Sequence, residues 1–284
     1  MHIQRGAWAE INLDAIAHNV QMAKANLKPT TKLCAVVKAD AYGHGAVRVA
    51  QEAARNGADF FAVALLQEGV KLREAGIEKP ILVLGSMLPE VAEICVRYDI
   101  SHAVFDEERL YALNAAALKL HTKAKIHIKI DTGMHRIGVH VRDAGRFAKL
   151  AASLPGIYIE GVFSHFATAD ADDKQYAAYQ FERFQEALRL IEAEGVHIPI
   201  RHIANSAALT ELQEYQLDMV RQGITLYGLH PAHMIDCYKD FEPVMTVKTQ
   251  VAFVKTLPPG ETIGYGRTYT LTRPSVIATV PIGY

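Results

Sequence analysis

The run KIHIKID (residues 125–131) carries the pattern that decides the fold. Three isoleucines alternate with His127, Lys129 and Asp131, which is the two-residue period of a β-strand. A strand covered by helices needs an apolar face toward them. We therefore expect the isoleucines to face helices and the polar set to point into the interior of a closed sheet.

Seven further β-rich runs surround this strand, and amphipathic helical patterns such as 46–57, 106–120 and 174–195 lie between runs. They are KLCAVVK (32–38), FFAVA (60–64), ILVLG (81–85), HAVF (102–105), IEGVFSHF (159–166), RHIANS (201–206) and MVRQGITLYG (219–228). Eight alternating β and α units predict an α/β fold, the (β/α)8 TIM barrel. The alternative is an open doubly wound sheet, whose first strand should lead into a GxGxxG turn that VVKADAYGHG (36–45) lacks.

The texture changes after the barrel. Residues 240–284 alternate without a helical period and contain Pro258-Pro259-Gly260, which indicates antiparallel hairpins. We expect a barrel domain over 1–239 and a β domain beginning at 240, with residues 1–12 able to pair with it. The apolar strand ending at Tyr284 leaves a sheet edge open. We therefore expect a C-terminally truncated β domain, and little or no activity from this fragment alone.

Composition excludes several classes of protein. Lys plus Arg is 30 and Asp plus Glu is 31 among 284 residues, so no net charge attracts nucleic acid or an anionic membrane. Three cysteines (Cys34, Cys95, Cys237) without a CxxC pair disfavour disulfides and zinc ribbons. The 13 histidines show no HxH or HExxH spacing, so we expect no metal site. Without a signal segment or a membrane span, we expect a soluble, cytoplasmic protein.

Lys38 ends an otherwise apolar strand. It is either a strand-end lysine that reaches solvent, or a desolvated amine of lowered pKa that can act as an imine-forming nucleophile. The loop that follows, ADAYGHG (39–45), contains Tyr42 and two glycines and is suited to close packing on a ligand. This loop favours the second interpretation.

Two more cations point to an anionic ligand. Lys129 lies on the inner face of the barrel, where it either pairs with an acid such as Asp131 or requires an added anion to offset Arg136. Arg136, in DTGMHRIG (131–138), is either a surface residue or a fork that captures a carboxylate or phosphate.

The last two strands predict a phosphate site. In a TIM barrel, the loops after strands seven and eight hold phosphate with backbone N–H groups. Asn205 and Ser206 follow the seventh strand, with Ser206 expected as helix N-cap, and Arg221 leads into Gly223 at the eighth. A phosphate site, a reactive lysine and an arginine for a carboxylate together indicate pyridoxal phosphate and an amino acid.

Seven motifs in order resemble bacterial alanine racemase, a fold-type III pyridoxal-phosphate enzyme. They are AVVKADAYGHG (35–45), KIDTGMHRIG (129–138), FSHFATAD (163–170), HIANSAAL (202–209), RQGITLYGLHP (221–231), GYGRTY (264–269) and TVPIGY (279–284). The resemblance implies a homodimer whose active site lies between the barrel of one subunit and the β domain of its partner. Lys38 would hold the cofactor and act as one catalytic base, and Tyr265 from the partner would act on the opposite face of the substrate. Tyr265 then needs a lowered pKa, since an unperturbed phenol near ~10 is a poor base.

The resemblance assigns the remaining roles. Arg221 would face the pyridine nitrogen and disfavour its protonation, which makes the ring a weaker electron sink, and His165 would support Arg221. Arg136 would hold the phenolic oxygen of the cofactor and the substrate carboxylate, and in many members of the family the lysine that matches Lys129 is carbamylated. The other implied contacts are Tyr42, Ser206, Gly223 and Ile224 for the phosphate, Asn205 near the cofactor, and Tyr284 at the substrate entrance.

The implied activity is interconversion of L- and D-alanine, which supplies D-alanine for peptidoglycan. Three alternatives remain: a serine or broad-specificity racemase of the same fold type, a decarboxylase, and a non-catalytic pyridoxal-phosphate-binding barrel. Arg221 argues against the decarboxylase, because such enzymes should place an acid at the pyridine nitrogen. The segment 240–284 argues against the non-catalytic barrel.

Overall fold

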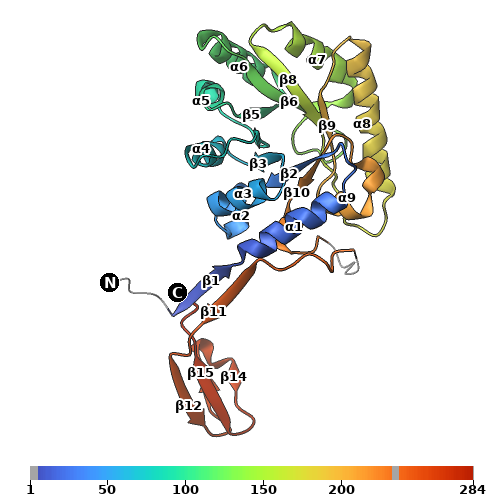
Figure 1. Ribbon diagram of the computed structural model, residues 1–284. Coiled ribbons are helices and arrows are strands. Elements are labelled where there is room, and N and C mark those ends of the chain that lie inside the picture. Colours follow the sequence, from blue (N-terminus) through green and yellow to red (C-terminus); the bar gives the residue numbers. More distant parts are fainter. Residues whose placement is uncertain (1–5, 232–236, 284) are drawn as a thin grey trace. The chain divides into compact units, whose positions relative to one another are not determined.

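The computed structural model describes residues 6–231 and 237–283 (Figure 1). The chain divides into two compact units. One runs from Leu13 to Val244, and the other joins the N-terminal residues up to Asn12 to the segment that begins at Met245.

The larger unit is built on eight parallel strands, one in each predicted run. They are β2 (Lys32–Val36), β3 (Phe60–Val63), β4 (Ile81–Val83), β5 (Ser101–Val104), β6 (Ala124–Asp131), β8 (Ile157–Phe163), β9 (Ile200–His202) and β10 (Met219–Gln222). They pair in the order β10-β2-β3-β4-β5-β6-β8-β9, and the short β7 (Val139–His140) pairs with β6. Backbone bonds from Asp218 N to Arg201 O (3.0 Å) and from Arg221 N to Ala204 O (3.1 Å) join the two ends. The predicted barrel is confirmed.

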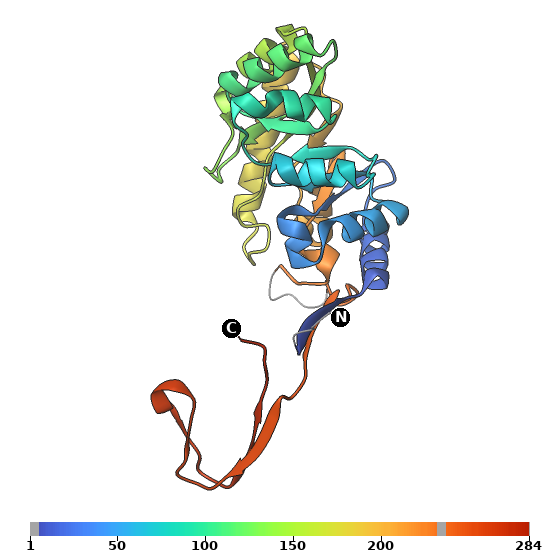
Figure 2. The ribbon, with the colours of Figure 1, turned by 90° about the vertical axis from the view of Figure 1, so that its left-hand side faces the viewer.

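Helices lie on the outside of the strands (Figures 1 and 2). They are α1 (Leu13–Ala25), α3 (Ala46–Arg55), α4 (Leu66–Glu74), α5 (Ala92–Arg97), α6 (Glu107–Lys119), α7 (Ala144–Ser153), α8 (Gln175–Ala193) and α9 (Ser206–Glu211). Each buries one stripe; α3, for example, buries Val49, Ala50 and Ala53. Within the described ranges, none of the helices combines the length and apolarity that crossing a bilayer would require.

The last two predicted strands are too long. Asn205 Oδ1 accepts a hydrogen bond from Ala208 N at 3.1 Å, so Asn205 is the N-cap of α9. The expectation that Ser206 is the cap was wrong, because Ser206 is the first residue inside the helix. After β10, Ile224–Tyr227 forms a 3-10 turn instead of continuing the strand.

The barrel interior has an apolar part and a polar part. Cys34, Val36, Phe60, Ala62, Leu82, Ile200 and Met219 form one packed cluster. His127, Lys129, His202 and Arg221 are also buried, from β6, β9 and β10. The predicted inward direction of the polar set of β6 is confirmed for His127, which contacts His202 of β9, and for Lys129, whose buried amine lies within the electrostatic influence of Arg221 of β10.

The segment after Lys38 forms a left-handed turn. Ala39, Asp40, Ala41 and Tyr42 of α2 (Lys38–Gly43) have φ between 51° and 55°. This conformation is unfavourable for L-residues by roughly 1–2 kcal/mol each. The carboxylate of Glu68 accepts hydrogen bonds from Ala39 N (2.5 Å) and Ala64 N (2.8 Å), and these bonds tie the turn to the start of α4.

The smaller unit consists of antiparallel pairs. Strand β1 (Ala7–Ile11) pairs with β11 (Met245–Thr249), β12 (Phe253–Leu257) with β15 (Ser275–Thr279), and β13 (Thr262–Ile263) with β14 (Tyr269–Thr270). The turn Tyr265–Arg267 lies between β13 and β14. The predicted β-rich C-terminal region is confirmed.

The left-handed turn predicts opposite effects for two Ala→Gly substitutions at exposed positions. Ala39→Gly should raise the free energy of unfolding by about 0.5–1 kcal/mol, because glycine adopts positive φ without steric cost. Ala115→Gly, in the middle of α6, should lower it by about 1 kcal/mol. Chemical denaturation measures both; equal destabilisation by the two variants would contradict a strained turn.

Candidate active site

A cavity of about 660 Å³ opens at the carboxyl ends of the barrel strands. Its volume lies within the ~300–1,000 Å³ typical of small-molecule sites. It is lined by all ten barrel residues singled out from the sequence: Lys38, Tyr42, Lys129, Arg136, His165, Asn205, Ser206, Arg221, Gly223 and Ile224. The sequence did not predict the apolar part of the lining, which includes Leu84, Met134, Phe163 and Phe166. In the sequence, apolar residues that line a cavity cannot be distinguished from those of the hydrophobic core. The fold therefore brings these ten residues together in one cavity.

Lys38 stands at the mouth of β2 with an uncommitted amine. Its Nζ lies 5.7 Å from the centroid of the Tyr42 ring. That ring packs against Tyr227, whose hydroxyl donates to Val36 O at 2.9 Å. Across the described parts of the chain, Lys38 Nζ makes neither a hydrogen bond nor an ion pair. The turn therefore presents a lysine amine that is available to a ligand in the cavity.

Arg221 is a fully buried cation held by neutral groups. Its Nη1 donates to His202 Nδ1 at 2.7 Å, and its Nη2 donates to Ser164 O (2.8 Å), Ile203 O (3.0 Å) and His165 Nδ1 (3.0 Å). Burial lowers its pKa to about 10, so the guanidinium stays charged at neutral pH. Its Nε has no partner among the described residues.

The two histidines that touch Arg221 are neutral acceptors. An arginine only donates, so Nδ1 of both His165 and His202 must carry a lone pair and the proton must sit on Nε2. Burial, and then the charge of Arg221, lower the pKa of His165 and of His202 well below the ordinary value. Geometry and electrostatics therefore agree on the neutral Nε2–H form.

Lys129 lies in the same cationic environment. Its Nζ donates to Ile130 O at 2.8 Å and stands 5.4 Å from the centroid of the Phe163 ring. Among the described residues no hydrogen bond or ion pair joins Lys129 to Asp131, whose carboxylate binds His135, although the charge of Asp131 acts to raise the pKa of Lys129. Burial, followed by repulsion from Arg221, lowers the pKa of Lys129 to about 7. Much of this amine is consequently neutral at physiological pH.

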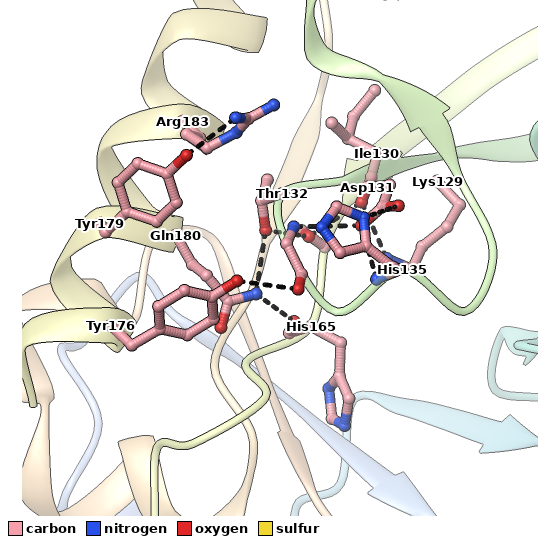
Figure 3. A network of polar contacts seen from close by, with 12 residues as sticks. Lys129, Ile130, Asp131, Thr132, His135, His165, Tyr176, Tyr179, Gln180 and Arg183 are labelled. Carbon is pink, nitrogen blue, oxygen red and sulfur yellow. Dashed lines mark hydrogen bonds and ion pairs between the residues drawn. The ribbon is translucent and has the colours of Figure 1, made fainter.

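The loop between Asp131 and His135, which leads directly into Arg136, is braced by the Asp131 carboxylate; Figure 3 shows the contacts of Asp131 with His135. The Asp131 carboxylate accepts from Gly133 N and His135 N, each at 3.0 Å, and contacts the His135 ring. Gln180 of α8 donates to Thr132 Oγ1 and to His165 O, which ties the loop to the next one. Arg136 itself is exposed to the cavity and forms no ion pair in the ranges 6–231 and 237–283.

The hydroxyl groups of Tyr42 and Ser206 lie on either side of Gly223 in the wall of the cavity. Ser206 Oγ accepts from Gly223 N at 2.8 Å and from Thr225 Oγ1 at 3.2 Å, which leaves its own O–H to donate. A Cβ on Gly223 would stand 3.4 Å from Tyr42 Oη and 3.7 Å from Ser206 Oγ. Glycine therefore keeps the space between these hydroxyls open for an acceptor.

Two predicted residues lie elsewhere. Tyr265 belongs to the smaller unit, and the residue is 93 % exposed there. Tyr284 falls outside the described residues. In the described part of the chain, no cluster of three or more His, Cys, Asp or Glu side chains is arranged to hold a metal ion.

Known proteins share this architecture. Residues 11–231 match the family model of the alanine racemase N-terminal domain, and residues 244–284 match that of the C-terminal domain. The alanine racemase of Desulfovibrio desulfuricans is 46 % identical over 280 residues, which cover 99 % of this chain and 76 % of the relative. That of Halothermothrix orenii is 45 % identical over 282 residues, covering 99 % and 74 %.

Solved structures agree. The alanine racemase of Clostridium difficile superposes with a TM-score of 0.94 at 40 % identity, covering 100 % of this chain and 75 % of that one. The Bacillus anthracis alanine racemase with bound L-Ala-P gives 0.91 at 37 % identity, covering 99 % and 73 %. The chain is therefore a two-unit protein. A barrel with a cavity that contains Lys38 is joined to a β-rich unit. This chain belongs to the alanine racemase family.

The loop that carries Arg136 predicts an acid-sensitive contribution to stability. Burial raises the pKa of Asp131, but the hydrogen bonds from His135 N and Gly133 N outweigh it and lower the pKa below 3.8. This contribution is complete above the unfolded pKa of 3.8 and is lost as the pH falls through the lower folded value.

Asp131→Asn should therefore lower the free energy of unfolding by about 1 kcal/mol at neutral pH, and the difference from the unsubstituted protein should shrink below pH 3.8. Asp143→Asn, at an exposed pair with Arg142, serves as the control and should change little. Urea titrations over a pH series measure both. A difference for Asp131→Asn that grows toward low pH would contradict the assignment.

Proposed function

We propose that this chain interconverts L- and D-alanine with pyridoxal phosphate as its cofactor. The observation that carries the proposal is the gathering of an uncommitted lysine, a buried arginine with a free Nε, and an exposed arginine in one cavity. When bound, the cofactor supplies an electron sink that makes the substrate Cα proton acidic.

The donor set fits this cofactor. Lys38 Nζ would hold it covalently, because that amine has no competing partner among the described residues. The hydroxyls of Tyr42 and Ser206, with Gly223 and Ile224 beside them, would bind its phosphate, and Asn205 lies along the same wall. The open Nε of Arg221 would donate to the ring nitrogen; a cation there disfavours ring protonation and limits side reactions.

Arg136 is the proposed partner of the substrate carboxylate, since it faces the cavity without an ion pair to any described residue. A small amino acid is supported by two relatives whose structures contain L-Ala-P and cycloserine. Serine or several small amino acids remain the alternative within the same fold type. Comparing alanine with serine as substrates separates the two.

Racemisation requires bases on both faces of the substrate Cα. We assign one to Lys38 Nζ and the other to the partner subunit's Tyr265, so the active protein is proposed to be a homodimer. The high exposure of Tyr265 and of Phe253, Val254 and Val276 supports an interface at the smaller unit. His165 would orient that tyrosine through its Nε2–H.

Peptidoglycan synthesis is the proposed destination of D-alanine, and the cytoplasm is the proposed compartment. Cys34 and Cys95 are buried free thiols, which suits reducing conditions.

The purified full-length protein, loaded with pyridoxal phosphate, should form D-alanine from L-alanine and the reverse, and borohydride reduction should label Lys38. Lys38→Ala should lower kcat by ~10²–10⁴-fold, since it removes a general base as well as the cofactor anchor. The exposed Lys119→Ala is the control. Chiral chromatography and peptide mapping are the measurements.

A label on another lysine, or serine turned over far faster than alanine, would overturn this assignment. In deuterium oxide, Tyr265→Phe should slow solvent isotope incorporation unequally from the two enantiomers. Unchanged rates from both would remove Tyr265 from the mechanism.

Lys129 should carry a carbamate. Its neutral amine can attack carbon dioxide: the nitrogen lone pair forms the new N–C bond, one C=O electron pair moves onto oxygen, and the nitrogen loses one proton. A neutral amine thereby becomes an anionic carbamate. The anion would offset Arg136 and Arg221. Native mass spectrometry at mildly alkaline pH should show one added CO2 that acid removes and that Lys129→Gln lacks; an unmodified mass under saturating bicarbonate would contradict it.

A further inference from the structure

A line of hydrogen bonds crosses the barrel core beneath the cavity. Ser101 Oγ donates to Glu160 Oε2 at 2.5 Å, and the same carboxylate oxygen lies 3.0 Å from His127 Nε2. His127 Nδ1 lies 2.9 Å from His202 Nε2, and His202 Nδ1 accepts from Arg221. The line links β5, β8, β6, β9 and β10.

Only one direction of donation satisfies every member. Arg221 donates, so His202 Nδ1 accepts and His202 must carry its proton on Nε2. That proton can be donated only to His127 Nδ1, which places the His127 proton on Nε2, facing the Glu160 carboxylate. The reverse direction would require His202 to accept at both nitrogens, which is an imidazolate. Arg221 and Glu160 are therefore the cationic and anionic ends of one chain of hydrogen bonds that runs through His202 and His127; we call this chain the relay.

The backbone is shaped for this relay. Between β6 and β8 the register jumps, so that Ile126 pairs with Ile159 but His127 pairs with Gly161. Glu160 is the extra residue of this bulge, and a bulge re-aims a side chain. A Cβ on Gly161 would lie 2.4 Å from His127 Nδ1, so only glycine leaves room for the ring.

Aromatic contacts fix the two imidazoles. The Phe163 ring stacks on His202 with centroids 4.9 Å apart and an interplanar angle of 7°. Phe60 meets His127 edge-on at 5.8 Å. Both imidazoles are fully buried, and the Glu160 side chain is 12 % exposed. Neither ring can turn over to exchange its nitrogens without breaking this packing.

The relay also compensates the positive charge of Arg221, because it ends at the Glu160 carboxylate. The side chains bonded to that guanidinium are neutral histidines, and Arg136 adds positive charge to the same cavity. Although burial raises the pKa of Glu160, the hydrogen bonds from His127 and Ser101 hold it below its ordinary value. The carboxylate is therefore ionised at neutral pH.

We infer that Glu160 is a positioning residue. Through His127 and His202 it holds both imidazoles in the Nε2–H tautomer and thereby keeps Arg221 in the orientation in which Nη1 binds His202 and Nε has no partner among the described residues. The inference rests on the proposed function only in what Arg221 does in the cavity; the tautomers are a property of the protein alone.

Side-chain ¹⁵N NMR of histidine-labelled protein without cofactor tests the tautomers directly. At mildly alkaline pH, His127 and His202 should both be neutral with the proton on Nε2, and Glu160→Gln should preserve this, because its amide oxygen still accepts from His127. Glu160→Leu removes the acceptor, and His127 should then populate its second tautomer. A proton on Nδ1 of either histidine in the unsubstituted protein overturns the inference, whatever the activity.

Kinetics and the absorption spectrum of the bound cofactor test the consequence. Glu160→Leu should lower kcat about tenfold or more and shift the visible absorption band, while KM for alanine changes less than about twofold, because Arg136 is untouched. Glu160→Gln should restore kcat to within about threefold. Asp59→Asn, which removes an ion-paired carboxylate from Lys24 outside the relay, is the control for general destabilisation.

A Glu160→Leu enzyme with the band and kcat of the Asp59→Asn control overturns the inference. So does a Glu160→Gln enzyme as impaired as Glu160→Leu. If the protein does not racemise alanine at all, the proposed function fails, while the tautomers and the absorption band still decide the role of Glu160.

Discussion

The buried guanidinium of Arg221 is the constraint on which the rest of the site depends. A charge removed from water is costly unless every donor is matched. The barrel offsets much of this cost by pairing Nη1 and Nη2 with two backbone carbonyls and two imidazole nitrogens, and Nε has no partner among the described residues. Because Arg221 can only donate, His165 and His202 must accept from it as neutral imidazoles. His127, on the inner face of β6, continues this line of hydrogen bonds to the carboxylate of Glu160.

The same cation accounts for the electrostatics of the pocket. Arg221, Arg136 and Lys38 line one cavity in a chain whose net charge is −1. An anionic ligand is therefore attracted by a few cationic side chains in the cavity and not by the net charge of the protein. The strained turn after Lys38 serves this arrangement, because it brings Tyr42 beside Ser206 and leaves the lysine amine open to the cavity.

Much of this arrangement could be predicted from sequence periodicity. The eight strands are recognisable as short β-rich runs, and parallel strands in a barrel gather their carboxyl ends. Lys38, Arg136, His165, Ser206 and Arg221 could therefore be placed together on the strength of the amino-acid pattern. The polar face of KIHIKID likewise indicated its direction. These inferences depend only on the period of a strand and the closure of a sheet.

Other features depend on contacts that no local pattern encodes. Asn205 and Ser206 are both good N-caps, and only the bond to Ala208 N decides between them. The left-handed turn at Ala39–Tyr42 is held by Glu68, which lies far along the chain. Glu160 has the sequence pattern of an outward-facing strand residue, because its redirection comes from a register shift against β6.

A crystal structure of the protein with pyridoxal phosphate is the most direct test of the account. We expect pyridoxal phosphate to be linked covalently to Lys38 Nζ. Arg221 Nε should donate to the pyridine nitrogen, and Arg221 should remain bonded to His202. A cofactor held by another lysine, or a pyridine nitrogen facing an acid with Arg221 turned away, would contradict it.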